Sequence, residues 1–216
     1  MCYNYSMIKK LIRENYIYLI IISVLIILFT IIMRSSLLDK IIIIDNQVID
    51  FMKLIVNKYL TFIFKIFTFI GDFYIPVFII VCCFFLFKNK WYSVLLSCGY
   101  LFSGFMSFFC KYLSLRPRPI DALISIPKSY SFPSGHTLTS VVFYFLLWYL
   151  LTINSTKKVK TMSLIVTIIC ITLIAISRMY LGVHYFSDVV GGYIIGLFCL
   201  SIIINIINLN FKEKLK

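Results

Sequence analysis

The sequence predicts an all-α protein, a bundle of six transmembrane helices with an amphipathic helix at the membrane interface between the first two spans. Two observations predict this class. The 216 residues are 62% hydrophobic and only 13% charged, whereas soluble domains carry about 25% charged residues. Several runs that are almost free of charge also approach about 20 residues, the length that a helix needs to cross a bilayer. No linker rich in Pro, Gly or Ser divides the chain, so residues 1–216 are expected to form one integral-membrane domain.

The expected spans follow one another along the chain. They are residues 16–33, 66–87, 91–110, 137–156, 161–177 and 189–211. The second run is interrupted by Gly71, Asp72 and Pro76. Basic residues precede the first run at 9–13, as in a secretory signal, but no small-x-small cleavage site follows it. We therefore expect the first span to be an uncleaved signal anchor.

Segment 41–59, between the first two spans, alternates at helical spacing. Its polar stripe is Asn46, Asp50, Lys53 and Asn57, and its opposite, apolar stripe is Ile44, Val48, Met52, Ile55 and Tyr59. This pattern is typical of a helix that lies in the membrane interface. A helix packed over the outer end of the bundle would show the same pattern, and the two interpretations are compatible.

The net charge of +13 is explained by topology and anionic lipid, and no nucleic-acid partner is expected. In a six-span arrangement, four basic clusters fall on one side of the membrane, at 9–13, 88–90, 157–160 and 212–216. The positive-inside rule makes this side the cytoplasm. We expect a multi-pass protein of the cell membrane with both termini cytoplasmic and the loops after spans three and five outside.

The outer face gathers the residues that can carry chemistry: Lys111, Arg116, Arg118, His136, Arg178, His184 and Asp188. Titratable groups beside a bilayer core are costly and usually functional. Cations outnumber acids in this set, which favours an anionic ligand, and arginine matches phosphate oxygens well. Ser134 and Gly135 stand before an apolar run. There a serine can cap the helix, and the free backbone amides of its N-terminus favour an anion.

The two histidines of the chain can divide the chemistry between them. His184 and Asp188 are four residues apart and would share a helix face if the last span began near Val183. A carboxylate on one imidazole nitrogen fixes the tautomer and leaves the other nitrogen free as a nucleophile. His136 could then protonate a leaving oxygen. Each feature alone fits a helix cap or a basic loop on lipid headgroups, so the interpretation depends on their coincidence at one face.

Three stretches resemble the three-part signature of the type 2 phosphatidic acid phosphatase superfamily, in its integral-membrane branch. Lys-x6-Arg-Pro is matched at 111–119, Pro-Ser-Gly-His at 133–136, and Ser-Arg-x5-His-x3-Asp at 177–188. The resemblance implies these phosphate-binding residues: Lys111, Arg118, Arg178, Ser134 and the backbone N–H of Gly135. It implies His184 as the nucleophile that forms a phosphohistidine, Asp188 as its orienting partner and His136 as the general acid. Arg116 lies outside the motif and is expected to be only an auxiliary contact.

The resemblance also implies a metal-independent phosphatase with no cofactor, and no carboxylate cluster in the sequence suggests a metal site. The expected partner is a membrane lipid with a phosphate or pyrophosphate headgroup, and no obligate protein partner is predicted. Undecaprenyl pyrophosphate is the favoured substrate, with phosphatidylglycerol phosphate and phosphatidic acid as alternatives. An anion transporter or channel is the rival of a different class. Against it, the charges cluster at one face, and the spans show no paired broken helices in matching halves.

Overall fold

The computed structural model describes residues 39–211 and a few positions nearer the ends, namely 23–24, 27, 30 and 215. Within this part the regular structure is helical. The elements are α2 (Asp39–Leu54), α3 (Lys58–Ile70), α4 (Tyr74–Leu86), α5 (Trp91–Ser114), α6 (Gly135–Thr152), α7 (Lys157–Tyr180) and α8 (Phe186–Asn210). The expected first span, 16–33, lies almost entirely outside the described residues, so the signal anchor stays a prediction.

Four described helices are long and apolar enough to cross a membrane: α5, α6, α7 and α8. Helices α3 and α4 pass the same test only as a pair, which is bent by 47° at the break between them. The described residues therefore hold four candidate spans, or five when the bent pair counts as one span. The six-span count is not confirmed.

The break between α3 and α4 has a local cause and a close-packed environment. Gly71 caps α3, and its backbone N–H donates to the carbonyl of Phe67 at 3.2 Å. The Asp72 carboxylate then accepts the amide of Phe73 at 2.8 Å, and Pro76 stands in the first turn of α4, where a helix requires no N–H. A Cβ on Gly71 would lie 2.5 Å from Ile174 of α7, so only glycine lets the break sit this close.

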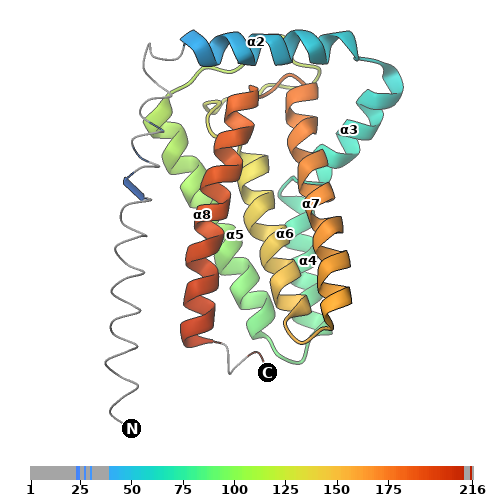
Figure 1. Cartoon of the computed structure of the whole chain (residues 1–216), viewed down its shortest axis with the longest axis vertical. Helices are drawn as coiled ribbons and strands as arrows, with labels where there is room; N and C mark the ends of the chain where they lie inside the picture. Colours follow the sequence, from blue (N-terminus) through green and yellow to red (C-terminus); the bar gives the residue numbers. More distant parts are fainter. Residues whose placement is uncertain (1–22, 25–26, 28–29, 31–38, 212–214, 216) are drawn as a thin grey trace.

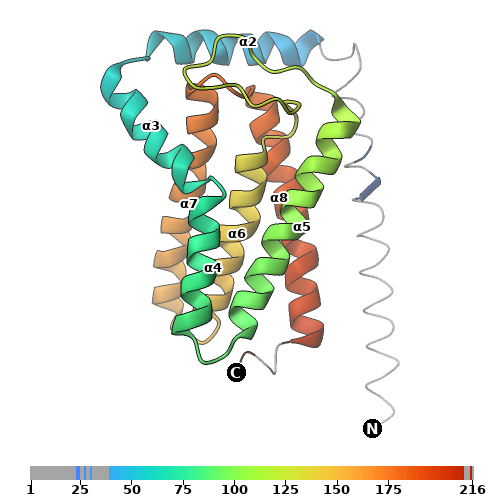
Figure 2. The same cartoon turned by 180° about the vertical axis from the view of Figure 1, so that it is seen from behind.

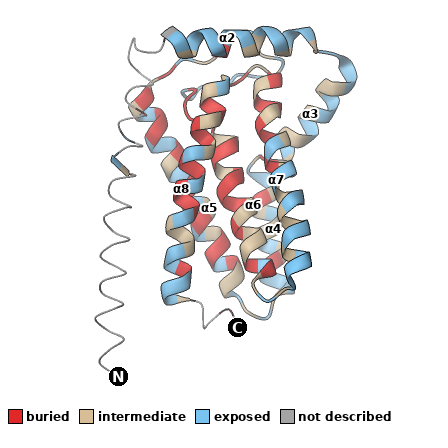
Figure 3. Cartoon of the chain, viewed as in Figure 1, coloured by how far each residue is buried: buried red, intermediate tan, exposed pale blue. Residues whose placement is uncertain are grey.

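The long helices run side by side with α6 among them, packed against α5, α7 and α8 (Figures 1 and 2). Buried residues concentrate on α6 and on the sides of its neighbours that face it (Figure 3). The core side chains of α6 are Leu138, Val141, Val142, Phe143, Leu146 and Leu150. Helix α8 meets α6 through small residues, since a Cβ on Gly196 would lie 2.9 Å from Val141. Such small-residue contacts let helix backbones approach in membrane proteins.

Helix α2 lies across one end of the bundle, as Figure 1 shows. It ends at Leu54, so the expected helix over 41–59 is too long, and Asn57 already caps α3 by accepting the amide of Leu60 at 2.9 Å. The predicted apolar stripe is also partly wrong. Ile44 is exposed, whereas Asp45 is buried toward the bundle. Packing over the bundle end is thus the interpretation that the structure supports directly.

The arrangement makes the predicted orientation testable at two loop positions. Ser125 lies in the α5–α6 connection at the end that carries α2, and Ser155 lies in the α6–α7 turn at the opposite end (Figure 1). In a cysteine-free background, Ser125→Cys should react with an impermeant maleimide on intact cells. Ser155→Cys should react only after permeabilisation. The reverse pattern would place the α2 end of the bundle in the cytoplasm.

Candidate active site

Segments far apart in the sequence bring the predicted site residues together at the end of the bundle that α2 covers. Lys111 is in the last turn of α5, Arg118 in the α5–α6 connection, Ser134, Gly135 and His136 at the start of α6, Arg178 in the last turn of α7, His184 between α7 and α8, and Asp188 in the first turn of α8. The His136 ring interacts electrostatically with Arg178, His184, Lys111 and Arg118. His136 thus lies within reach of the three side chains predicted to bind phosphate through their positive charge.

Lys111 is buried, and its ammonium is satisfied by backbone carbonyls of the α5–α6 connection. Nζ donates to the carbonyl of Tyr130 at 2.6 Å and to that of Pro133 at 3.0 Å. The chain can fold back over Lys111 because α5 ends at Ser114, where the left-handed conformation of the C-cap Leu115 (φ 50°) stops the helix. A buried ammonium needs such acceptors. Here they also fix the segment that leads into α6.

The N-terminus of α6 forms a compact turn beside Lys111. Ser134 is the N-cap, and its hydroxyl accepts a hydrogen bond from Thr137 Oγ1 at 2.9 Å. Its own amide donates to the Asp188 carbonyl at 2.9 Å, which ties α6 to α8. A Cβ on Gly135 would lie 3.1 Å from Ser107 Oγ and 3.8 Å from Lys111 Cε. A positive helix end and an ammonium therefore stand side by side, which is a favourable site for an anion.

His184 and Asp188 meet, although not in the way that their spacing predicts. Helix α8 begins at Phe186, so His184 precedes it and the two do not share a helix face. Instead, Asp188 reaches back from the first turn. Its Oδ2 accepts the amide of Tyr185 at 2.9 Å and lies 3.3 Å from Nδ1 of His184. An acid that returns to the N-cap amide is a common helix start, and here it also orients the imidazole.

The neighbours of His184 determine its tautomer. Nη1 of Arg118 lies 3.1 Å from Nε2 of the ring. Because arginine only donates, Nε2 must offer its lone pair, and the ring proton is then on Nδ1, toward Asp188. Burial lowers the pKa of His184 to about 3, with Asp188 acting in the opposite direction and Lys111 and Arg118 adding to the decrease. The ring is therefore neutral at physiological pH, with Nε2 as its nucleophilic atom.

Arg118 also joins the two loops of the site. Its Nε donates to the carbonyl of Ser129 at 2.8 Å, and its Nη1 donates to the carbonyl of Val183 at 2.9 Å. The guanidinium thus bridges the α5–α6 connection and the α7–α8 connection beside His184. A fixed, planar set of donors suits this position better than a flexible ammonium would.

Arg178 is buried in the last turn of α7 and contacts α3. Its Nη1 donates to Thr68 Oγ1, a partner that the motifs do not reveal. Among the described residues, its Nε has no hydrogen-bond partner although it is buried. Leaving a buried charged donor unpaired is costly, so this atom requires an acceptor, which a phosphate oxygen would provide.

The auxiliary phosphate contact expected for Arg116 stays a prediction, and its ion pairs in the structure are with two carboxylates. Its Nη1 lies 2.6 Å from Oδ1 of Asp188, and its Nη2 lies 2.6 Å from Oδ2 of Asp45 on α2. The guanidinium also packs over the ring of Tyr185, 4.2 Å from the ring centroid. Sequence reasoning missed Asp45. The available signal was its place four residues after Ile41 and four before Ile49, on the face of α2 that turns inward.

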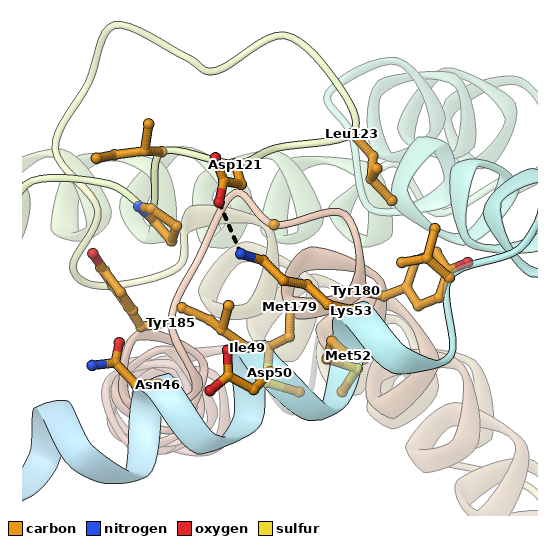
Figure 4. A pocket seen from close by; sticks show the side chains of 14 residues that line it. Asn46, Ile49, Asp50, Met52, Lys53, Asp121, Leu123, Met179, Tyr180 and Tyr185 are labelled. Atoms are coloured by element: carbon orange, nitrogen blue, oxygen red, sulfur yellow. Dashed lines mark hydrogen bonds and ion pairs between the residues drawn. The ribbon is translucent and has the colours of Figure 1, made fainter.

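A separate cavity of about 450 Å³ lies between α2, residues 119–123 and the α7–α8 connection (Figure 4). None of the predicted site residues lines it. Lys53 and Asp121 form an ion pair across it at 2.8 Å, and both side chains are exposed. Exposed pairs of this kind contribute little to stability. Because none of the predicted site residues lines this cavity, it is distinct from the candidate active site.

Comparisons with known proteins agree with the geometry. The family model described as PAP2 superfamily matches residues 92–212, which include every predicted site residue. Phosphatidylglycerophosphatase B of Bacillus subtilis (strain 168) is 30% identical over 152 residues, which cover 68% of this chain and 71% of that protein.

Two solved structures are also similar. The crystal structure of a transmembrane PAP2-type phosphatidylglycerolphosphate phosphatase from Bacillus subtilis matches with a TM-score of 0.76 and 27% identity, covering 89% of this chain and 96% of that one. Aquifex aeolicus LpxE matches with a TM-score of 0.61 and 22% identity, covering 74% of this chain and 94% of that one. At 22% identity, the second match bears on the fold alone.

Arg118→Lys should weaken anion binding although it preserves the charge. A single ammonium cannot serve both loops and an anion at once, and the loss of one charge-assisted hydrogen bond corresponds to roughly tenfold to a hundredfold in affinity. Calorimetric titration with orthovanadate, a phosphate mimic, measures this change. Lys128→Gln, an exposed cation of the same connection, is the control and should bind normally. Normal affinity in Arg118→Lys would leave Arg118 with a purely structural role.

Proposed function

Because the chain belongs to the PAP2 superfamily, we propose that it is a membrane lipid phosphatase whose reaction centre is the cluster around His184. The observation that carries the proposal is the state of this ring. It is buried and neutral, with Nδ1 toward Asp188 and Nε2 toward Arg118. An activated nucleophile held by an orienting carboxylate is the arrangement required for covalent catalysis.

In the proposed reaction, cations and backbone amides bind the terminal phosphate, and His184 attacks it. The phosphate-binding groups are Lys111, Arg118, Arg178, Ser134 and the backbone N–H of Gly135. As the phosphate binds, the Nη1–H of Arg118 moves from Nε2 to a phosphate oxygen, which frees the lone pair. Nε2 then forms a bond to phosphorus while the bond to the leaving oxygen breaks. His136, which carries a second proton while the bound phosphate stabilises its positive charge, gives that oxygen its proton and becomes neutral.

Water completes the cycle by attacking the phosphohistidine: its oxygen bonds to phosphorus while the Nε2–P bond breaks, His136 accepts the proton of the water, and inorganic phosphate leaves. Asp188 keeps hold of the Nδ1–H throughout and stabilises the positive charge that the ring carries while phosphorylated. The same groups neutralise the phosphate in both steps, because their positions are fixed by the backbone contacts described above.

The fold and the relatives support a lipid substrate. A site at the end of a membrane bundle suits a lipid whose tail stays in the bilayer. Undecaprenyl pyrophosphate is the substrate expected at first. We now rank phosphatidylglycerol phosphate before it, a choice that the names of the relatives at 30% and 27% identity support. Undecaprenyl pyrophosphate and phosphatidic acid remain the competing substrates.

Phosphate release should persist when divalent metals are removed. The basic side chains and the N-terminus of α6 supply the charge, and among the described residues no three of His, Cys, Asp and Glu come together as a metal site. The purified protein in detergent would be assayed with EDTA on phosphatidylglycerol phosphate, undecaprenyl pyrophosphate and phosphatidic acid. His184→Ala controls for contaminating phosphatases. Activity lost in EDTA and restored by magnesium would contradict the proposed mechanism.

The two histidines should fail in different ways. His184→Ala should abolish both turnover and the acid-labile phosphoenzyme, since it removes the attacking atom. His136→Ala should lower turnover of lipid phosphates by roughly 10²–10⁴, the usual contribution of a general acid. With nitrophenyl phosphate, whose leaving group needs no proton, part of that loss should be recovered. Quenching in alkaline detergent after substrate labelled in its terminal phosphate preserves the phosphoenzyme, and loss of the label on acid treatment identifies it as phosphohistidine. A phosphoenzyme that persists in His184→Ala and vanishes in His136→Ala would reverse the roles.

A further inference from the structure

The Asp188 carboxylate has donors on both oxygens. Oδ2 receives the amide of Tyr185 at 2.9 Å and the hydroxyl of Ser131, and it lies 3.3 Å from Nδ1 of His184. Oδ1 lies 2.6 Å from Nη1 of Arg116. The strength with which Asp188 holds the imidazole therefore depends on how much of its charge Arg116 neutralises.

Arg116 is itself shared with a second carboxylate. Its Nη2 lies 2.6 Å from Oδ2 of Asp45, which comes from α2. Asp45 also accepts the amide of Ser187 at 2.9 Å and the hydroxyl of Ser187 at 2.6 Å. Only 1% of the Asp45 side chain is exposed, 7% of Arg116 and none of Asp188, so water screens these charges little. One buried cation thus serves two buried anions.

This sharing has an electrostatic consequence for the imidazole. Asp45, Arg116 and Asp188 together keep a net negative charge, because one guanidinium pairs with two carboxylates. Asp188 can therefore still stabilise a positive charge on the His184 ring. Without the charge of Asp45, Arg116 would pair with Asp188 alone and neutralise more of the negative charge on Asp188. The hydrogen bond from Nδ1 of His184 would then weaken, because a carboxylate whose charge is neutralised is a poorer acceptor.

We propose that Asp45 is a positioning residue for the Asp188–His184 pair and acts through Arg116, so that α2 is part of the catalytic apparatus as well as the cover of the bundle. The inference rests on the proposed function, because it assigns Asp45 a role toward the nucleophile of that reaction.

A docking role alone is the rival explanation, since Asp45 also ties α2 to the start of α8 through Ser187. Docking requires hydrogen bonds and is indifferent to the charge left on Asp188. The other charged groups that face the His184 ring are Lys111 on α5, Arg118 in the α5–α6 connection and His136 on α6. They remain the same in every Asp45, Arg116 and Asp50 variant below, so differences between these variants report on Asp45 and Arg116.

The test uses Asp45→Asn in the full-length protein, because asparagine keeps the shape and one acceptor oxygen but removes the charge. We expect kcat on the best lipid substrate to fall by roughly tenfold, the value of one charge-assisted hydrogen bond, with KM unchanged. The Nδ1–H proton resonance of His184 should move upfield as its hydrogen bond weakens. Only two histidines are present, so a His136→Gln variant assigns the spectrum.

Arg116→Gln should move the same resonance in the opposite direction, because both carboxylates then keep their charge. The double variant Asp45→Asn/Arg116→Gln should return it close to the wild-type position. Asp50→Asn, the same substitution at an exposed position of α2, is the matched control and should change neither kcat nor the spectrum. Opposite and compensating shifts are what charge sharing predicts and docking does not.

A folded Asp45→Asn protein with unchanged kcat and an unchanged Nδ1–H resonance would overturn the proposal and leave Asp45 as a docking residue. If Arg116→Gln fails to fold, the Asp45→Asn result decides alone. The spectroscopic arm needs no turnover. If the wild-type protein releases phosphate from no lipid, the proposed function fails, while the direction of the resonance shift still decides whether Asp45 acts on the Asp188–His184 pair.

Discussion

The buried carboxylate of Asp188 is the interaction on which the rest of the site depends. Its side chain receives donors from the α5–α6 connection, from Arg116 and from the start of α8, and its backbone carbonyl accepts the amide that begins α6. A buried charge is tolerated only with such a complete set of partners. The partners come from segments that carry the other predicted site residues, so satisfying one carboxylate assembles much of the candidate active site.

The cations follow a related principle. Lys111 and Arg118 are held largely by backbone carbonyls, and Arg178 by Thr68 of α3. Carbonyl dipoles satisfy a positive group without cancelling its charge, so the cluster stays attractive to an anion. An ion pair at each position would have neutralised it. Arg116 differs from these three cations, because both of its terminal nitrogens are paired with carboxylates.

The sequence predicts the parts of this structure that depend on local properties. Length and hydropathy suffice for α5 to α8, and the motif spacings place the site residues at the ends of these helices. Other contacts join residues that are far apart in the sequence. Asp45 and Arg116 are 71 residues apart, and Thr68 and Arg178 are 110 residues apart. Helical periodicity identifies the faces of one helix but cannot say which face packs against which partner. The end of α2 was predicted wrongly and the burial of Asp45 was missed, because both depend on such contacts. His184 lies outside α8 because the carboxylate of Asp188, in the first turn of this helix, accepts the amide of the N-cap residue Tyr185. A spacing of four residues fits this arrangement as well as it fits two residues on one helix face.

The tight break at Gly71 limits which substitutions related sequences can accept at this position. A side chain there would collide with Ile174 and press toward Ser140 and His136, although Gly71 itself bears no reactive group. Lipid-facing positions on α5 and α7 can exchange one apolar residue for another at little cost. Gly71 is restricted by space alone. Among divergent sequences, an unvarying glycine at this position would therefore record the shape of the fold around His136 and carry no information about which lipid is cleaved.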